Sequence, residues 1–107
     1  MIEELVFNLC DNAIRYNRGG GRVDVTVGMR GDQVMLSVKD TGIGIPPDSQ
    51  ERIFERFYRV DKSRSKLTGG TGLGLAIVKH IVAQHDARIE LHSEVGKGTE
   101  MVVWFPV

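Results

Sequence analysis

The chain has 107 residues, of which 41% are hydrophobic and 26% are charged, and its formal net charge is zero. This length and composition fit one small domain with a single core, and the balanced charge argues against a general nucleic-acid binder, which carries a basic excess. No apolar run approaches the ~20 residues that a membrane-spanning helix needs. The single cysteine, Cys10, excludes an internal disulfide framework and fits a reducing cytoplasm.

The first part of the chain is predicted to form a helix followed by an antiparallel hairpin. Residues 2–17 carry apolar side chains at three- and four-residue spacing, which predicts an amphipathic helix that ends at a run of three glycines. Residues 22–30 and 33–39 alternate apolar and polar side chains, so each is predicted to be a half-buried strand. The inward positions expected in the first strand are Val23, Val25, Val27 and Met29.

The rest of the chain is predicted to contain two loops, two helices and a second hairpin. In chain order these are a glycine loop at 40–46, a short helix capped by Asp48 or Ser49 and running through Phe57, a long loop at 58–70, a strongly apolar helix at 72–85, and strands at 87–93 and 99–106. This order of elements predicts an α+β fold, a two-layer sandwich.

Two asparagines four residues apart, Asn8 and Asn12, share one face of the first helix. Amide oxygens are hard ligands, suited to a magnesium ion that keeps most of its waters and bridges substrate phosphates. Arg15 is placed one turn further on, where it can contact a phosphate, and Tyr16 can stack on a base. The alternative is a solvated asparagine pair beside a core tyrosine, which is common for polar helix residues.

An aspartate, Asp40, follows the inward register of the second strand, so its carboxylate is expected to point into the domain. A buried carboxylate needs a donor, and the exocyclic amine of adenine is a suitable one. Gly42 and Gly44 are expected to let the backbone approach a ligand without a Cβ clash. The alternative is an aspartate that caps an ordinary glycine turn.

A glycine-rich loop precedes the apolar helix, with Thr71 among its glycines. Free backbone amides and the positive end of the helix suit a phosphate group. The loop lacks the Gly-Lys-Ser/Thr ending of a Walker motif and the preceding strand of a dinucleotide fingerprint. A merely flexible loop is the alternative.

A local surplus of basic residues lies just before this loop, and such a segment is expected to close over a triphosphate. Arg59 is the functional candidate because Phe57 and Tyr58 can anchor it. The alternative is a solvated charged loop. The basic residues are Arg52, Arg56, Arg59, Lys62, Arg64 and Lys66.

Together these segments resemble the ATP-binding catalytic domain of bacterial sensor histidine kinases, of the phosphate-response or cell-wall sensor type. The wider group includes DNA gyrase, the mismatch-repair ATPase and a heat-shock chaperone. Four boxes of the family and its closing turn appear in the family's order, which is a specific combination. They are the N box at 8–13 with Tyr16, the first glycine box at 40–46, the F box at 53–59, the second glycine box at 70–78 and the turn at 96–99.

The resemblance implies a Bergerat-type fold, in which a mixed, mostly antiparallel sheet is covered on one face by about three helices. Residues 1–107 would then be the catalytic domain of a longer kinase, without its phosphoacceptor and dimerisation domain and without the strand that precedes the first helix. One local departure from the family is Asp86-Ala87, which stands where Gly-Gly is frequent.

The resemblance also implies residue roles. Asn12 would ligate Mg²⁺, and Asn8 and Arg59 would be the catalytic residues at the phosphates. Arg15 would lie near the phosphates, Tyr16 would flank the adenine, and Asp40 would accept from its amine. Residues 47–70 would form an ATP lid. The other nucleotide contacts would be Gly42, Gly44, Ile45, Gly70, Thr71, Gly72, Leu73, Gly74, Leu75 and Thr99.

The implied activity is transfer of the γ-phosphate of ATP to a histidine on the separate dimerisation domain, with a response regulator downstream. The chain alone would bind ATP as a monomer without autophosphorylation, as the cytoplasmic domain of a membrane-anchored, homodimeric sensor that binds no nucleic acid. An ATPase clamp is one alternative, although the hydrolytic relatives carry a glutamate at the place of Asn8 to activate water. A nucleotide-sensing module without phosphoryl transfer is the other.

Overall fold

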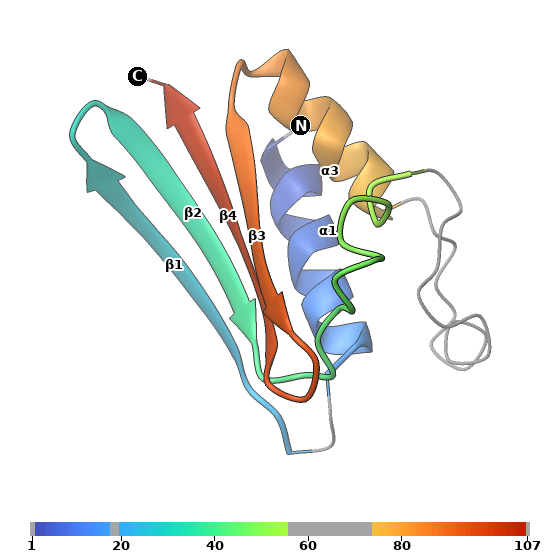
Figure 1. The fold of residues 1–107 in the computed structure, drawn as a ribbon. Coiled ribbons are helices and arrows are strands. Elements are labelled where there is room, and N and C mark those ends of the chain that lie inside the picture. The colour runs from blue at the N-terminus through green and yellow to red at the C-terminus, as the bar shows by residue number, and fades with distance from the viewer. Residues whose placement is uncertain (1, 18–19, 56–73, 107) are drawn as a thin grey trace.

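The computed structural model describes residues 2–17, 20–55 and 74–106. In these residues two helices pack on one face of a four-stranded sheet (Figure 1). The strands lie in the order β1-β2-β4-β3, and every neighbouring pair is antiparallel. The predicted two-layer α+β class is therefore confirmed. The elements are α1 (Ile2–Arg15), β1 (Val23–Arg30), β2 (Gln33–Asp40), α3 (Gly74–Gln84), β3 (Arg88–Glu94) and β4 (Gly98–Pro106).

Helix α1 forms where the apolar spacing predicts it. Leu5, Leu9 and Ala13, each four residues from the next, are buried against the sheet. Two glutamates in the first turn and an arginine in the last complement the helix dipole. The helix ends at Arg15, two residues earlier than predicted.

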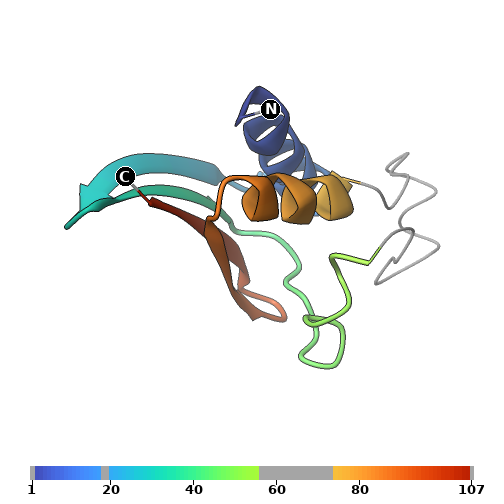
Figure 2. The same cartoon turned by 90° about the horizontal axis from the view of Figure 1, so that it is seen from above.

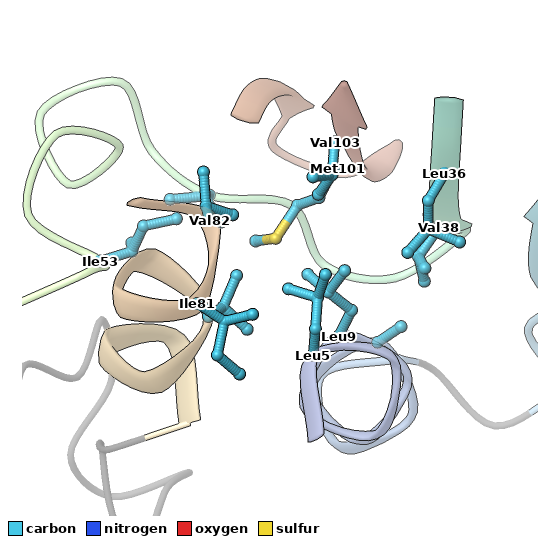
Figure 3. Packing of buried hydrophobic residues seen from close by; sticks show 12 residues of the cluster. Leu5, Leu9, Leu36, Val38, Ile53, Ile81, Val82, Met101 and Val103 are labelled. Carbon is cyan, nitrogen blue, oxygen red and sulfur yellow. The ribbon is translucent and has the colours of Figure 1, made fainter. Parts of the chain in front are cut away.

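The core lies between the helices and the sheet (Figure 3). Val103 of β4 and Val78 of α3 have no exposed surface. Full burial of such a side chain stabilises the fold by roughly 1.5–3 kcal/mol. The labelled side chains of Figure 3 converge from both layers and, at Ile53, from the connection between β2 and α3: Leu5, Leu9, Leu36, Val38, Ile53, Ile81, Val82, Met101 and Val103.

The strand register places side chains in rows that cross all four strands on the helix-facing side. Two of these rows are apolar from end to end: one is Val27, Leu36, Val103 and Ile89, and the next is Val25, Val38, Met101 and Leu91. The row that ends the sheet is polar on three strands, and it consists of Val23, Asp40, Thr99 and Ser93.

Strand β1 differs from its prediction. Val25, Val27 and Met29 lie on the helix-facing side, as the alternation indicates, but they expose 50%, 69% and 60% of their surface. The half-buried strand predicted from the sequence is therefore wrong at these positions. The reason is that β1 is an edge strand, and the hairpin of β1 and β2 projects beyond the helices (Figure 2). Alternation predicts which way a side chain points, but not what covers it.

Two connections refine the predicted boundaries. The helix expected up to Phe57 is replaced, in its described part, by successive turns in which N–H groups donate three residues back, as from Ser49 to Pro46 at 2.9 Å. Asp86, at the departure from the family's Gly-Gly, takes a left-handed conformation with a φ of 52°. Aspartate tolerates this region better than most residues.

Candidate functional site

The polar row at the end of the sheet borders a small hollow between α1 and the strands. Its volume is about 180 Å³, including space that is open to solvent. The structure thus brings three of the predicted site residues to one place: Asn12 of α1, Asp40 of β2 and Thr99 of β4. The lining residues are Leu9, Asn12, Ala13, Val38, Asp40, Thr99 and Met101.

Asp40 is 7% exposed, as its inward register predicted. Its Oδ1 accepts the backbone N–H of Gly42 at 2.9 Å and that of Thr99 at 3.3 Å. Burial raises the pKa of Asp40 above its ordinary value of 3.8, and the two backbone hydrogen bonds lower it in part. No donor among the described residues reaches Oδ2. The carboxylate is therefore held by one oxygen and keeps acceptor capacity on the other.

A second cluster of hydrogen bonds centres on Ser93, which the sequence analysis missed. The Ser93 Oγ accepts the N–H of Ile45 at 2.7 Å, donates to the carbonyl of Gly98 at 3.1 Å and lies 2.7 Å from Thr99 Oγ1. It ties the glycine loop after β2 to the sheet beside Asp40. The available signal was a serine that continues the inward alternation of its strand.

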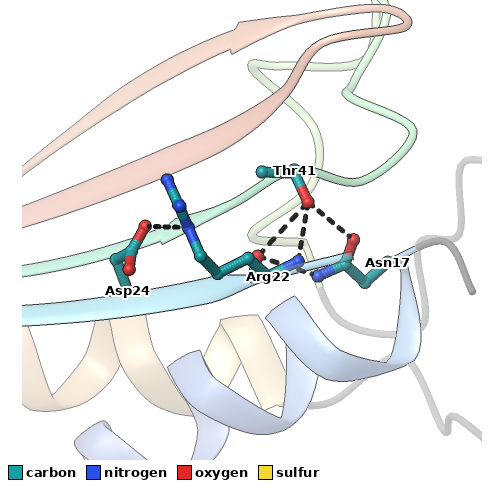
Figure 4. A network of polar contacts seen from close by, with 4 residues as sticks. All are labelled: Asn17, Arg22, Asp24 and Thr41. Atoms are coloured by element: carbon teal, nitrogen blue, oxygen red, sulfur yellow. Dashed lines mark hydrogen bonds and ion pairs between the residues drawn. The ribbon is translucent and has the colours of Figure 1, made fainter. Parts of the chain in front are cut away.

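A third network joins the end of α1 to both strands of the first hairpin (Figure 4). The N–H of Arg22 donates to Thr41 Oγ1 at 2.8 Å, and Asn17 Nδ2 donates to the Arg22 carbonyl at 3.0 Å. The Thr41 hydroxyl lies 3.4 Å from both Asn17 Oδ1 and the Arg22 carbonyl. These hydrogen bonds hold Thr41, the residue that follows Asp40, in place. None of these three residues was predicted from the sequence as a site residue.

The two glycines of the first glycine box are needed for packing of the chain on itself. A Cβ at Gly42 would meet the Tyr16 carbonyl and, at 2.9 Å, Asp40 Oδ1. Gly44 has a φ of 77°, and a Cβ there would meet the backbone of Glu94. The space that the sequence analysis reserved for a ligand at these glycines is filled by protein backbone.

The asparagine face of α1 is also partly engaged within the chain. Asn8 Nδ2 donates to the Glu4 carbonyl at 2.8 Å. Asn8 Oδ1 lies beside the start of α3, where a Cβ added to Gly74 would be 3.2 Å from it. The structure therefore places the N box next to Gly74 of the second glycine box.

Arg15 and Tyr16 have partners within the chain. Arg15 Nε donates to Asp11 Oδ2 at 2.7 Å, an ion pair along the helix. The Tyr16 carbonyl accepts the N–H of Ile43 at 3.2 Å. A phosphate contact by Arg15 would compete with its ion pair.

Of the other predicted site residues, some are described and pack within the domain, and the rest lie outside the described part of the chain. Ile45 is 9% exposed, and Leu75 packs against the core. The described residues contain no group of three or more His, Cys, Asp or Glu side chains able to hold a metal ion. Neither described helix is long and apolar enough to cross a membrane. Five predicted site residues lie outside the described part of the chain: Arg59, Gly70, Thr71, Gly72 and Leu73.

A sequence model of the histidine kinase-, DNA gyrase B-, and HSP90-like ATPase family matches residues 1–107. The chain belongs to this family. The match explains why the inward aspartate, the asparagine helix and the glycine loops occur together in one small sandwich. ATP binding is the shared property that membership of this ATPase family implies.

Among curated relatives, the chain is 50% identical over 103 residues to the sensor histidine kinase RppB of Synechocystis, covering 96% of this chain and 23% of RppB. It is 50% identical over 101 residues to the sensor-like histidine kinase SenX3 of Mycolicibacterium smegmatis, covering 94% of this chain and 26% of the relative. The chain thus spans about a quarter of the length of these relatives.

Solved structures give the same family and confirm the fold. The mycobacterial sensor histidine kinase MprB superposes with a TM-score of 0.85 at 35% identity, over 96% of this chain and 70% of the MprB chain. Full-length ShkA, solved in complex with AMPPNP, superposes with a TM-score of 0.82 at 34% identity, over 98% of this chain and 21% of ShkA.

Proposed function

We propose that this chain binds Mg-ATP and, within a longer sensor histidine kinase, presents the γ-phosphate for transfer to a histidine on a separate dimerisation domain. A response regulator would then receive the phosphate. Residues 1–107 would be the catalytic domain of that kinase, on the cytoplasmic side of a membrane-anchored protein. The relatives that are named sensor histidine kinases support this reading, and ShkA, which superposes on the chain, was solved with AMPPNP.

The observation that carries the proposal is the position of Asp40. Its carboxylate is buried at the hollow, and one of its oxygens has no donor among the described residues. An ionised carboxylate oxygen accepts hydrogen bonds only, so an oxygen that faces the hollow can take one from a donor on a ligand. The exocyclic amine of adenine is a donor, whereas guanine carries a carbonyl at the corresponding position. Asp40 would therefore select adenine.

Asn12 is the residue best placed to hold a magnesium ion together with the phosphates of ATP. It lines the same hollow as Asp40, on the side of α1 that carries Asn8. One amide oxygen, phosphate oxygens and waters form a coordination shell that Mg²⁺ accepts. The ion would screen the charge of the phosphates, while Asn12 would fix where they lie relative to the adenine.

Asn8 favours phosphoryl transfer over hydrolysis. It is an amide whose Nδ2 donates to the Glu4 carbonyl, and an amide does not take a proton from water. By the family resemblance, hydrolytic relatives carry a glutamate at this place. Asn8, Arg15, Arg59 and the glycines of the second box would contact the phosphates, and the histidine would come from the other domain.

Binding is tested with a fluorescent ATP analogue titrated against the chain, with and without Mg²⁺. Asp40→Asn is expected to weaken binding roughly tenfold to a hundredfold, because a hydrogen bond to a charged acceptor is lost, and to reduce the preference for ATP over GTP. Asp32→Asn, in the exposed turn of the first hairpin, is the matched control. Unchanged nucleotide selectivity in Asp40→Asn would remove the adenine role.

The metal assignment has its own experiment. Asn12→Ala should reduce the gain in affinity that Mg²⁺ gives, whereas Gln84→Ala, at the far end of α3, should leave that gain intact. An equal gain in Asn12→Ala and the wild type would count against Asn12 as the ligand.

Phosphoryl transfer requires a second protein component. The chain is mixed with a histidine-bearing dimerisation domain and ATP labelled on the γ-phosphate, and acid-labile label is followed on the histidine. We expect label on the dimerisation domain and negligible release of free phosphate by the chain alone. Steady hydrolysis without transfer would favour an ATPase, and binding without either reaction would favour a nucleotide sensor.

A further inference from the structure

The segment after the first glycine loop begins with two prolines, and it runs from the end of β2 past the turn between β3 and β4 (Figure 1). The last loop residue before them, Ile45, is 9% exposed, so its carbonyl needs a donor within the protein. Pro47 has no N–H group to offer. The N–H of Ser49, four residues after Ile45, donates to the carbonyl of Pro46 instead, at 2.9 Å. These nearby backbone groups therefore leave the Ile45 carbonyl to a side chain.

The side-chain amide of Gln50 supplies that donor. Its Nε2 donates to the Ile45 carbonyl at 2.9 Å and to the Ser93 carbonyl at 3.3 Å. An amide nitrogen carries two hydrogens, so this one group serves both acceptors. The N–H of Ile45 in turn donates to Ser93 Oγ at 2.7 Å. Gln50, Ile45 and Ser93 thus form a closed ring of hydrogen bonds, which joins the glycine loop, the segment after it and β3.

Both backbone groups that hold Asp40 belong to parts of the chain that this ring joins. One is the N–H of Gly42, which donates to Asp40 Oδ1 at 2.9 Å and lies in the same loop as Ile45. The other is the N–H of Thr99, which donates to the same oxygen at 3.3 Å. The hydroxyl of Thr99 lies 2.7 Å from Ser93 Oγ. A displacement of the ring would therefore move the two donors that orient the Asp40 carboxylate.

The far end of the segment is held by other contacts. Ile53 is 5% exposed in the core, and Lys79 Nζ of α3 lies 5.4 Å from the centre of the Phe54 ring. These contacts hold the segment to the helix layer, whereas Gln50 holds it to the sheet. Loss of the Gln50 hydrogen bonds would therefore loosen the glycine loop while the segment stays docked at Ile53 and Phe54.

We propose that Gln50 is a positioning residue for nucleotide selection, which keeps the Asp40 carboxylate oriented toward adenine by fixing Ile45 and Ser93. The inference rests on the proposed role of Asp40 in nucleotide binding. Gln50 acts through these residues, and its role depends on the two hydrogens of its amide. Leucine has a similar size but no donor, and an ionised glutamate would place a third acceptor beside two carbonyl groups.

Nucleotide titration of Gln50→Leu is the first test. Fluorescent analogues of ATP and GTP are titrated against the chain, and thermal unfolding followed by circular dichroism gives the folded fraction. We expect the affinity for ATP to fall roughly threefold to tenfold, and the preference for ATP over GTP to fall with it. Gln84→Leu, exposed at the end of α3, is the matched control and should change neither. A purely structural role would lower the unfolding midpoint alone.

Gln50→Glu tests whether the donor matters rather than the volume. Its protonated carboxyl can donate to one of the two carbonyl groups, whereas its ionised form cannot donate. The ATP affinity of Gln50→Glu, divided by that of the wild type at the same pH, should rise as the pH is lowered from about 8 to about 5. The division removes the titration that both proteins share, including that of Asp40. For the control Gln84→Glu, the ratio should stay constant.

Amide hydrogen exchange without nucleotide measures the ring directly. The N–H of Ile45 should exchange about tenfold faster in Gln50→Leu than in the wild type, because the loop that carries it has lost its second link to β3. The N–H of Ile43, which donates to the Tyr16 carbonyl at 3.2 Å, is the internal reference and should change less.

The outcomes separate this inference from the proposed function. If the wild type binds ATP with a preference that depends on Asp40, and Gln50→Leu keeps both affinity and preference, the positioning role of Gln50 is wrong and the proposed function stands. If the wild type binds no ATP, the proposed function fails and the role of Gln50 fails with it. A ratio for Gln50→Glu that is flat with pH would also overturn the inference, since a donor would then make no difference.

Discussion

Asp40 and Thr99 are cross-strand partners of β2 and β4, and the N–H of Thr99 donates to Asp40 Oδ1 at 3.3 Å. The pair ends two strands whose other helix-facing residues are apolar. The charged side chain of Asp40 therefore lies at the last helix-facing position of its strand, where the sheet ends below the end of α1. Because of this position, Asp40 is buried and still has a carboxylate oxygen that can accept a hydrogen bond.

The raised pKa of Asp40 gives a definite sign to the pH dependence of stability. A carboxyl whose pKa is higher in the folded state than its ordinary 3.8 stabilises the fold most at pH values below 3.8. That contribution is lost as the pH rises through the folded-state pKa. The free energy of unfolding of the wild type, minus that of Asp40→Asn, should therefore fall as the pH rises.

Urea unfolding at a series of pH values measures this difference. Thr26→Val, an exposed substitution in β1 that changes no titratable group, is the control, and its difference from the wild type should not show the same fall. A difference for Asp40 that grows with pH would mean that the two backbone hydrogen bonds outweigh the burial.

Replacing Thr41 by valine should destabilise the fold by about 1–3 kcal/mol, because the variant leaves the N–H of Arg22 without its side-chain acceptor. Thr26→Val is the comparison, since Thr26 is exposed in the middle of β1 and valine is at least as good a strand former. Chemical denaturation of both variants gives the numbers. Equal stability of the two would show that water replaces the Thr41 hydroxyl without cost.

Gly44 and Gly20 separate two costs of replacing a glycine by alanine. Their φ angles, 77° and 78°, are nearly equal, so both variants should lose about 1–2 kcal/mol from backbone strain. Only at Gly44 would the added Cβ also meet the backbone of Glu94, whereas no atom of the described residues lies within 4 Å of it at Gly20. Gly44→Ala should lose roughly 2–5 kcal/mol in total. Similar unfolding midpoints for the two variants would contradict the close packing of the loop on β3.

Ser93→Ala should lower both stability and ATP affinity. The variant removes the acceptor of the Ile45 N–H, at a cost of about 1–3 kcal/mol, and loosens Thr99 beside Asp40. Ser37→Ala is the matched control, because Ser37 is 5% exposed and donates to Glu100 at 2.8 Å on the other face of the sheet. It should lower stability alone. Nucleotide titrations of both variants distinguish the cases, and an unchanged affinity in Ser93→Ala would limit Ser93 to a structural role.

Much of the fold follows from the sequence because its signals are local. The four-residue spacing of Leu5, Leu9 and Ala13 sets the buried face of α1, and alternation sets the facing of all four strands. Asp40 was predicted to point inward because it continues such an alternation, and it does. The exposure of Val27 was not predictable in this way, since it depends on how far the helices extend across the sheet.

The candidate site was predictable only where its residues carry distinctive chemistry. Asn12 and Asp40 stood out as polar groups at inward or shared-face positions, and the structure brings both to the hollow. Ser93, Thr41 and Asn17 act through hydrogen bonds to residues distant in the chain, and their residue types are ordinary at strand ends and turns. Their partners become evident only once the strands are paired.

Ile43 joins three parts of the domain through its backbone alone. Its N–H donates to the carbonyl of Tyr16 at 3.2 Å, and its carbonyl accepts the N–H of Gly96 at 2.9 Å. These two hydrogen bonds connect the first glycine loop both to the end of α1 and to the turn between β3 and β4. A loop fixed in this way has already lost conformational entropy during folding. A nucleotide that binds against it therefore loses little further free energy in ordering the loop. The adenine end of the pocket would be preorganised, and amide hydrogen exchange at Ile43 and Gly96 should already be slow before any ligand arrives.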